Sequence, residues 1–161
     1  MKGCNRMIAL TPIGFVRNAR RDAGDDNWGG IVSEIAVEIG EDALDGIEAF
    51  SHAEVLFYFD RVPEEKIVRG ARHPRNNPNW PKVGILAQRG KNRPNRIGLA
   101  TVSVLRREGR VLFVTGLDAM DGTPVLDIKP VLREFEPRGE IRQPAWVSEL
   151  MQNYWKESEE R

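Results

Sequence analysis

Short apolar segments separated by turn residues recur along the chain, and their alternation of apolar and polar positions predicts β-strands. In residues 30–39, Ile35 and Val37 alternate with Glu34 and Glu38, as expected for a strand with one buried face. Further strands are predicted over residues 8–18, 53–61, 83–89, 96–107, 110–118 and 124–132. The pattern therefore predicts a mainly β fold, one small domain built as a barrel or a sandwich.

Helical spacing is clear only near the C-terminal end. Within residues 144–160, Pro144 suits the first position of a helix, and apolar residues recur every three or four positions. Residues 41–50 are a weaker candidate for one short helix, and residues 62–82, with four prolines, predict a long loop. The predicted apolar face of the C-terminal helix consists of Trp146, Leu150, Met151 and Tyr154.

The composition fits one globular domain. Of 161 residues, 40% are hydrophobic and 30% are charged, and we expect an irregular leader over residues 1–6 and a single domain over residues 7–161. The longest apolar runs, such as residues 55–59, are far too short to span a bilayer. A cytoplasmic protein is therefore expected. Cys4 is the only cysteine, so no intrachain disulfide forms.

The formal net charge of zero hides a marked asymmetry. Residues 66–107 contain eleven Lys and Arg residues and no Asp or Glu, which leaves thirteen basic against twenty-four acidic residues in the remainder. A basic stretch of this length favours a polyanionic partner such as a nucleic acid. The alternative is a solvated loop that happens to be basic.

Signatures of the common cofactor and metal sites are missing. The sequence contains neither G-x-G-x-x-G nor a Walker-type G-K-[ST]. His52 and His73, with a single cysteine, make no zinc-ligand pattern, so no metal is expected. Nothing marks a nucleophile with its base, and no catalytic residue is assigned.

Two segments carry more specific chemistry. Residues 87–100 place four cations near two glycines and Pro94, which suits close approach of the backbone to an anion. In residues 116–130, Asp118 follows an apolar strand, where its carboxylate either accepts hydrogen bonds from a ribose or an amine or caps the turn. The four cations are Arg89, Lys91, Arg93 and Arg96.

Four strings in order are similar to one known family. They are TPIGFVRN at residues 11–18, FSHAEVLFYFD at 50–60, RPNRIGLA at 93–100 and GLDAMDGTPVLDIKP at 116–130. The chain resembles, from Met7 to about Lys156, the TsaA-like (TrmO) family of S-adenosylmethionine-dependent methyltransferases. Departures from the family pattern include Arg96 in place of proline, Ala100 in place of serine and Val131 in place of tyrosine.

The resemblance implies a small β-barrel that binds S-adenosylmethionine, forms a homodimer and methylates N6 of threonylcarbamoyl-adenosine next to the anticodon of tRNA. Two alternatives are the same chemistry on another substrate and a non-catalytic module that binds the cofactor or RNA. The family's cofactor contacts correspond in this chain to Asn27, Trp28, Gly29, Asp60, Arg61, Arg89, Leu99, Thr115, Gly116, Leu117 and Asp118.

Roles for these residues follow from the chemistry of the cofactor that the resemblance implies. Arg89 suits the cofactor carboxylate and Asp118 a ribose hydroxyl or the amine, while Leu99 and Leu117 are expected to sandwich the base. Lys91, Arg93 and Arg96 are expected to face RNA phosphates.

Overall fold

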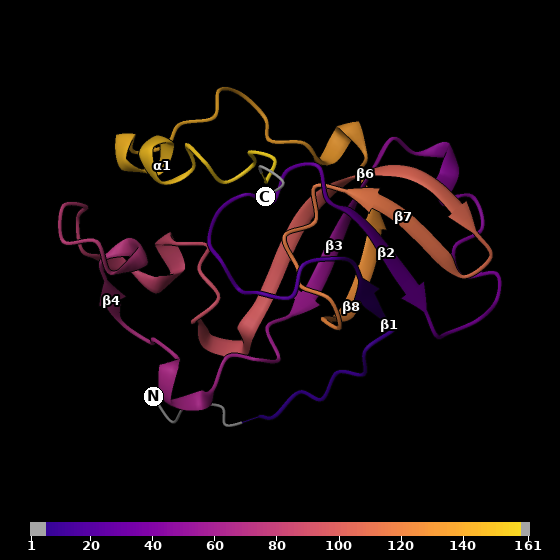
Figure 1. Cartoon of the computed structure of the whole chain (residues 1–161), viewed down its shortest axis with the longest axis horizontal. Helices are drawn as coiled ribbons and strands as arrows, with labels where there is room; N and C mark the ends of the chain where they lie inside the picture. The colour runs from indigo at the N-terminus through magenta and orange to yellow at the C-terminus, as the bar shows by residue number, and fades with distance from the viewer. Residues whose placement is uncertain (1–5, 159–161) are drawn as a thin grey trace.

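The computed structural model describes residues 6–158, and six of its strands close into a barrel. Of the expected leader, residues 1–6, only Arg6 belongs to the described part of the chain. Every neighbouring pair in the ring is antiparallel, in the order β1-β2-β7-β6-β3-β8 and back to β1 (Figure 1). The strands are β1 (Gly14–Arg17), β2 (Val32–Val37), β3 (His52–Tyr58), β6 (Ile97–Glu108), β7 (Val111–Thr115) and β8 (Pro124–Pro130). The mainly β barrel expected from the sequence is confirmed.

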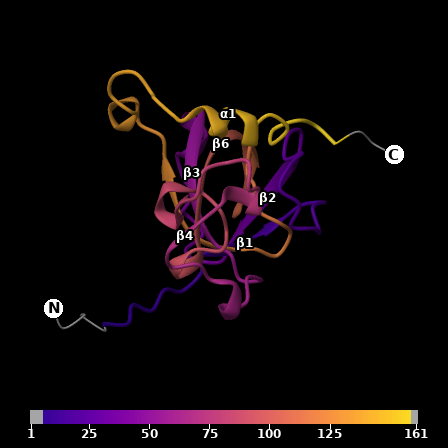
Figure 2. The same cartoon turned by 90° about the vertical axis from the view of Figure 1, so that its left-hand side faces the viewer.

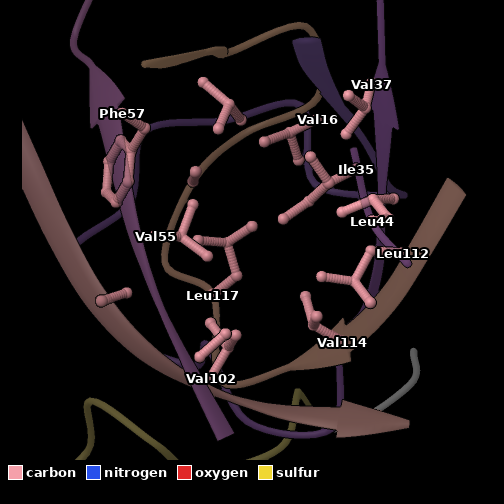
Figure 3. Packing of buried hydrophobic residues seen from close by; sticks show 14 residues of the cluster. Val16, Ile35, Val37, Leu44, Val55, Phe57, Val102, Leu112, Val114 and Leu117 are labelled. Carbon is pink, nitrogen blue, oxygen red and sulfur yellow. The ribbon is translucent and has the colours of Figure 1, made fainter. Parts of the chain in front are cut away.

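The inside of the barrel is filled by aliphatic side chains from every strand. Along β3 the buried and half-buried positions alternate, which places Ala53, Val55 and Phe57 inside. Figure 3 shows the packed cluster, in which Leu117 from the turn after β7 lies with the strand residues. Because this interior is full, the site must lie at an end of the barrel or on its outer surface.

A long excursion, residues 59–96, leaves the barrel between β3 and β6 and lies beside it (Figure 1). It agrees with the predicted loop over residues 62–82 except for short elements. Of the strand predicted over residues 83–89, only Val83 and Gly84 form one, paired with Ala71 and Arg72. The chain then enters a 3-10 turn, in which Ile85 is buried and Leu86 is 80% exposed. The excursion contains η2 (Glu64–Lys66), β4 (Ala71–Arg72), η3 (Pro74–Asn76), β5 (Val83–Gly84), η4 (Ile85–Ala87) and η5 (Pro94–Arg96).

The helix expected over residues 144–160 is much shorter in the structure. Only α1 (Ala145–Leu150) is α-helical, and Pro144 is its N-cap, with extended backbone, and not its first helical residue. Beyond Leu150 the chain continues as turns, and the carbonyl groups of Asn153, Tyr154 and Lys156 accept hydrogen bonds from the loop between β1 and β2. The four residues of the expected apolar face are all half-buried. Figure 2 shows α1 beside the end of the barrel.

The other helix candidate, residues 41–50, forms turns followed by a single 3-10 turn, η1 (Ile47–Ala49). Leu44 is buried and Ile47 half-buried, so the apolar spacing is satisfied without a full helix. One more 3-10 turn, η6 (Arg133–Phe135), lies between β8 and α1. No helix within residues 6–158 has the length and apolar character that crossing a bilayer requires.

Close packing at Gly98 gives a stability prediction. A Cβ atom at this position would overlap the ring of Phe57, which is fully buried in the core. We therefore expect Gly98→Ala to lower the free energy of unfolding by about 1–3 kcal/mol in chemical denaturation. Gly84→Ala is the matched control, since a Cβ there meets no atom within 4 Å. Equal stability of the two variants would contradict this packing.

Candidate functional site

Three connections meet at one end of the barrel because strand direction alternates around the ring. They are residues 18–31 between β1 and β2, residues 59–96 between β3 and β6, and residues 116–123 between β7 and β8. Asn18 joins two of them: its Nδ2 donates to Ser33 Oγ at 2.9 Å and to Ala119 O at 2.9 Å. Every residue that the resemblance assigns to the cofactor lies in or next to these connections.

The loop after β1 is irregular, and Arg20 holds it together. The guanidinium donates to the carbonyl oxygens of four loop residues, at 3.0–3.2 Å, and lies 4.3 Å from the centroid of the Trp28 ring. Only 11% of the Arg20 side chain is exposed. The loop therefore has a fixed shape, with Trp28 buried beneath it. The four acceptors are Asp22, Gly24, Asp26 and Asn27.

Asp118 lies at the centre of this end. Its Oδ2 accepts a hydrogen bond from the Tyr154 hydroxyl, whereas its Oδ1 is buried and has no partner within residues 6–158. Burial raises the pKa of the Asp118 carboxyl, and the hydrogen bond from Tyr154, the residue's own backbone amide and the charge of Arg89 oppose that rise. A buried acceptor without a donor is costly, so Oδ1 is a site at which a ligand donor would be stabilised.

Arg89 reaches the same place from the excursion. Its Nη2 donates to Leu99 O at 2.6 Å, and its charge lowers the pKa of Asp118. Arg89 and Asp118, which are predicted to hold opposite ends of one ligand, are thus near enough for the charge of Arg89 to act on the Asp118 carboxyl. The Arg89 residue itself is exposed, which leaves its remaining donors open to solvent.

The other predicted cofactor residues are distributed around this centre. Arg61 donates to Asp121 O at 2.8 Å, so it lies on the turn after Asp118, while Asp60 is exposed beside it. Thr115 ends β7, and Gly116 follows with φ +81°, a backbone conformation that glycine adopts without strain.

The segment that contains Asn27, Trp28 and Gly29 is already bonded within the chain. Their three backbone amides donate to Asn153 O at 3.1 Å, Tyr154 O at 2.8 Å and Lys156 O at 3.1 Å. These amides therefore fix the C-terminal segment in place.

The expected sandwich between Leu99 and Leu117 is wrong. Leu117 is fully buried inside the barrel with Val55 and Val102, whereas Leu99 is 40% exposed on the outer face of β6. The two side chains thus lie on opposite sides of the barrel wall and cannot enclose one base. The Leu99 carbonyl, which accepts from Arg89, is the part of that residue directed to the site.

The cations expected to face RNA all make contacts within the chain. Lys91 Nζ donates to Ala23 O at 3.0 Å, and Arg93 Nη1 donates to Gln88 O at 2.7 Å. Arg96 Nη2 forms an ion pair with Glu64 at 2.9 Å, and its Nη1 donates to Val62 O at 2.7 Å. Lys91 and Arg93 retain uncompensated charge because carbonyl oxygens do not neutralise it, whereas Arg96 is neutralised by a carboxylate.

The basic stretch as a whole is only partly neutralised. Within the part of the chain that the structure describes, five of its eleven cations form an ion pair with a carboxylate: Arg69, Arg75, Arg96, Arg106 and Arg107. The others, Lys66, Arg72, Lys82, Arg89, Lys91 and Arg93, have no such pair among residues 6–158. All six belong to the excursion, residues 59–96.

Sequence reasoning missed two side chains that shape the site. Tyr154 stood out only as part of a helical apolar face, yet its hydroxyl contacts Asp118. Arg75 binds Asp26 at 2.9 Å, and its charge acts on Tyr154. Neither role has a local signal, since each contact joins residues far apart in the sequence. No cluster of three or more His, Cys, Asp or Glu side chains suited to a metal ion occurs within residues 6–158.

Several known proteins are similar to this chain in sequence or in fold. A family model described as the tRNA-methyltransferase O N-terminal domain matches residues 25–136. A probable S-adenosyl-L-methionine-binding protein of Archaeoglobus fulgidus is 38% identical over 129 residues, which cover 77% of this chain and 34% of that protein. The tRNA (adenine(37)-N6)-methyltransferase of Homo sapiens is 34% identical over 113 residues, which cover 70% of this chain and 25% of that protein.

A crystal structure of TrmO superposes with a TM-score of 0.70 at 27% identity, and the match covers 86% of this chain and 64% of that one. The chain thus spans about a third of the length of the archaeal relative and a quarter of the human one. The family model alone covers more than half of the chain, and the solved structure has the same fold. This chain belongs to the family of the tRNA-methyltransferase O N-terminal domain.

Proposed function

We propose that this chain transfers a methyl group from S-adenosylmethionine to N6 of threonylcarbamoyl-adenosine next to the anticodon of tRNA. The observation that carries the proposal is the meeting of Arg89 with the buried Asp118, whose Oδ1 lacks a partner among residues 6–158, at the end of a barrel of this family. The names of the relatives point to the same cofactor and acceptor. They favour tRNA over a different acceptor or a non-catalytic module.

The residues present fit the chemistry of the cofactor. The guanidinium of Arg89 has donors free for a carboxylate, and Oδ1 of Asp118 is an acceptor for a ribose hydroxyl or an ammonium group. Thr115, Gly116 and Leu117 contribute through their backbone, since the Leu117 side chain is in the core. Further contacts come from the other two connections, which contain Asn27, Trp28, Gly29, Asp60 and Arg61.

Catalysis by this chain requires that the methyl donor and the acceptor nitrogen be bound in the correct relative orientation. The cofactor, when bound, supplies an electrophilic methyl group on a sulfonium, and the acceptor supplies the nitrogen nucleophile. Arg89 and Asp118 bind and orient, so that the attacking nitrogen, methyl carbon and sulfur align. The unpaired cations of the excursion hold the RNA backbone, and an anticodon-loop base is unstacked at low cost. No protein nucleophile is required.

Transfer of a tritiated methyl group to tRNA tests the function. We expect incorporation into tRNA that carries the threonylcarbamoyl modification and none into the same tRNA without it. Asp118→Asn removes the buried charge that binds the cofactor, so its affinity for S-adenosylmethionine is expected to fall about 10- to 100-fold in calorimetry. Asp42→Asn, an exposed carboxylate in the turn before η1, is the matched control and keeps full affinity. Absence of both binding and transfer by the unsubstituted chain would refute the proposal.

Contacts of Lys91, Arg93 and Arg96 with phosphates are part of the same proposal. Arg93 offers the cleanest test, because it has no carboxylate partner within residues 6–158. Arg93→Ala is expected to weaken tRNA binding and reduce the slope of log Kd against log salt by about 0.7–0.9, the loss of one phosphate contact. Arg110 lies in the hairpin between β6 and β7 and forms an ion pair with Glu41. Arg110→Ala is the control and is expected to leave the slope unchanged. An unchanged slope for Arg93→Ala removes it from the interface.

A cytoplasmic homodimer completes the proposal. Ile97, Leu99 and Leu105 on β6 are 38–48% exposed, which gives this strand apolar surface that a second copy can cover. Light scattering during gel filtration is expected to give twice the mass of one chain at micromolar concentration. A monomer mass under those conditions would contradict the dimer.

A further inference from the structure

The C-terminal segment, residues 151–157, enters the candidate site in a fixed register. Besides the three hydrogen bonds from residues 27–29, Gly29 forms a parallel bridge with Glu157. A Cβ at Gly29 would overlap Trp155 O, so the two backbones meet at a position where only glycine fits. Trp80 Nε1 donates to Glu149 Oε2 at 2.8 Å and ties the preceding helix to the excursion. The segment therefore joins both loops that flank Asp118.

This register determines where the Tyr154 side chain lies. The Tyr154 carbonyl accepts from Trp28 at 2.8 Å, its amide donates to Met151 O at 3.1 Å, and its ring meets Trp155 edge-on with centroids 5.0 Å apart. With backbone and ring both held, the hydroxyl is directed at Asp118 Oδ2. The contact is thus set by the fold and not by a freely rotating surface side chain.

The two carboxylate oxygens of Asp118 consequently differ in their hydrogen bonding. Oδ2 accepts a hydrogen bond from Tyr154, while Oδ1 is buried and has no donor within residues 6–158. The hydrogen bond from Tyr154 to Oδ2 fixes the orientation of the carboxylate. The lone pairs of Oδ1 therefore point in a defined direction.

We propose that Tyr154 is a positioning residue of the binding site: its hydroxyl orients the Asp118 carboxylate so that Oδ1 accepts a hydrogen bond from a hydroxyl or amino group of the bound nucleoside. The inference rests on the proposed function, because the nucleoside is that of S-adenosylmethionine. The charged groups that act on this pair are Arg89, which acts on Asp118 and Tyr154, and Arg75, which acts on Tyr154.

The hydrogen bond also favours the ionised form of Asp118. Burial raises the pKa of Asp118, and the bond from Tyr154 counteracts part of that rise. Removal of the hydroxyl should therefore raise the pKa further. Because only the ionised carboxylate has both oxygens free to accept, binding is lost as pH falls through this pKa, and the loss begins at a higher pH without Tyr154.

The test is calorimetric titration of the full chain with S-adenosylmethionine across a pH series. Tyr154→Phe keeps the ring and the main-chain bonds, and it is expected to weaken binding about tenfold at neutral pH. The midpoint of the loss at acidic pH is expected to move upward. Tyr58 is the other tyrosine of the chain and lies on the outer face of β3. Tyr58→Phe is therefore the matched control, and we expect it to bind S-adenosylmethionine as tightly as the unsubstituted chain does.

Each outcome decides the inference. Unchanged affinity of Tyr154→Phe, or a uniform loss without movement of the pH midpoint, would reduce Tyr154 to a structural role. Tighter binding would show that the segment competes with the ligand, which also overturns the inference. If the unsubstituted chain does not bind S-adenosylmethionine, the proposed function fails first and this inference with it.

A second variant guards against misfolding of the first. Gly29→Ala displaces Trp155 and so withdraws Tyr154 from Asp118 without change to either side chain. Burial is the largest influence on the pKa of Asp118, and displacement of the segment uncovers the carboxyl. The pKa of Asp118, followed by carboxyl-carbon NMR in the absence of ligand, is therefore expected to fall toward its ordinary value in Gly29→Ala, whereas it rises in Tyr154→Phe. Gly70→Ala, where a Cβ meets no atom within 4 Å, serves as its control. An unchanged pKa of Asp118 in Gly29→Ala would contradict the coupling.

Discussion

Closure of six antiparallel strands around a full core is the constraint on which the rest of the molecule depends. A closed ring has no free edge, and its filled interior leaves no cavity for a ligand. Since strand direction alternates around the ring, the connections β1–β2, β3–β6 and β7–β8 must emerge at the same end. Residues distant in sequence, such as Trp28, Arg89 and Asp118, are thereby brought together without any local motif that joins them.

The barrel was predictable because strand periodicity is a local property. Burial alternates along β3 from His52 to Tyr58 and along β2 as far as Ile35, and both strands were predicted within a few residues. The strand expected over residues 83–89 failed because an apolar run indicates burial and not pairing, and only Ile85 found a buried place. The C-terminal helix was overestimated for a related reason. Helical spacing persisted to Tyr154, but the backbone beyond Leu150 had stronger partners in residues 27–29.

The sequence predicts those parts of the site that depend on the charge and hydrogen-bonding groups of individual residues. Arg89 and Asp118 were expected at one ligand, and in the structure the charge of Arg89 acts on the Asp118 carboxyl. Leu99 and Leu117 were misjudged because both are apolar residues in matching strings, whereas the side of the barrel wall on which each lies depends on strand register. Tyr154 and Arg75 were beyond sequence reasoning, since their roles arise only from contacts across the fold.

The bonds between residues 27–29 and 153–156 carry a consequence for how the molecule is made. A ribosome releases the β1–β2 loop long before it releases Tyr154, so the barrel can close while this end of it is still unfinished. During that interval the Asp118 carboxylate lacks the hydrogen bond from the Tyr154 hydroxyl. Completion of this end of the barrel thus depends on residues that are synthesised after all six strands.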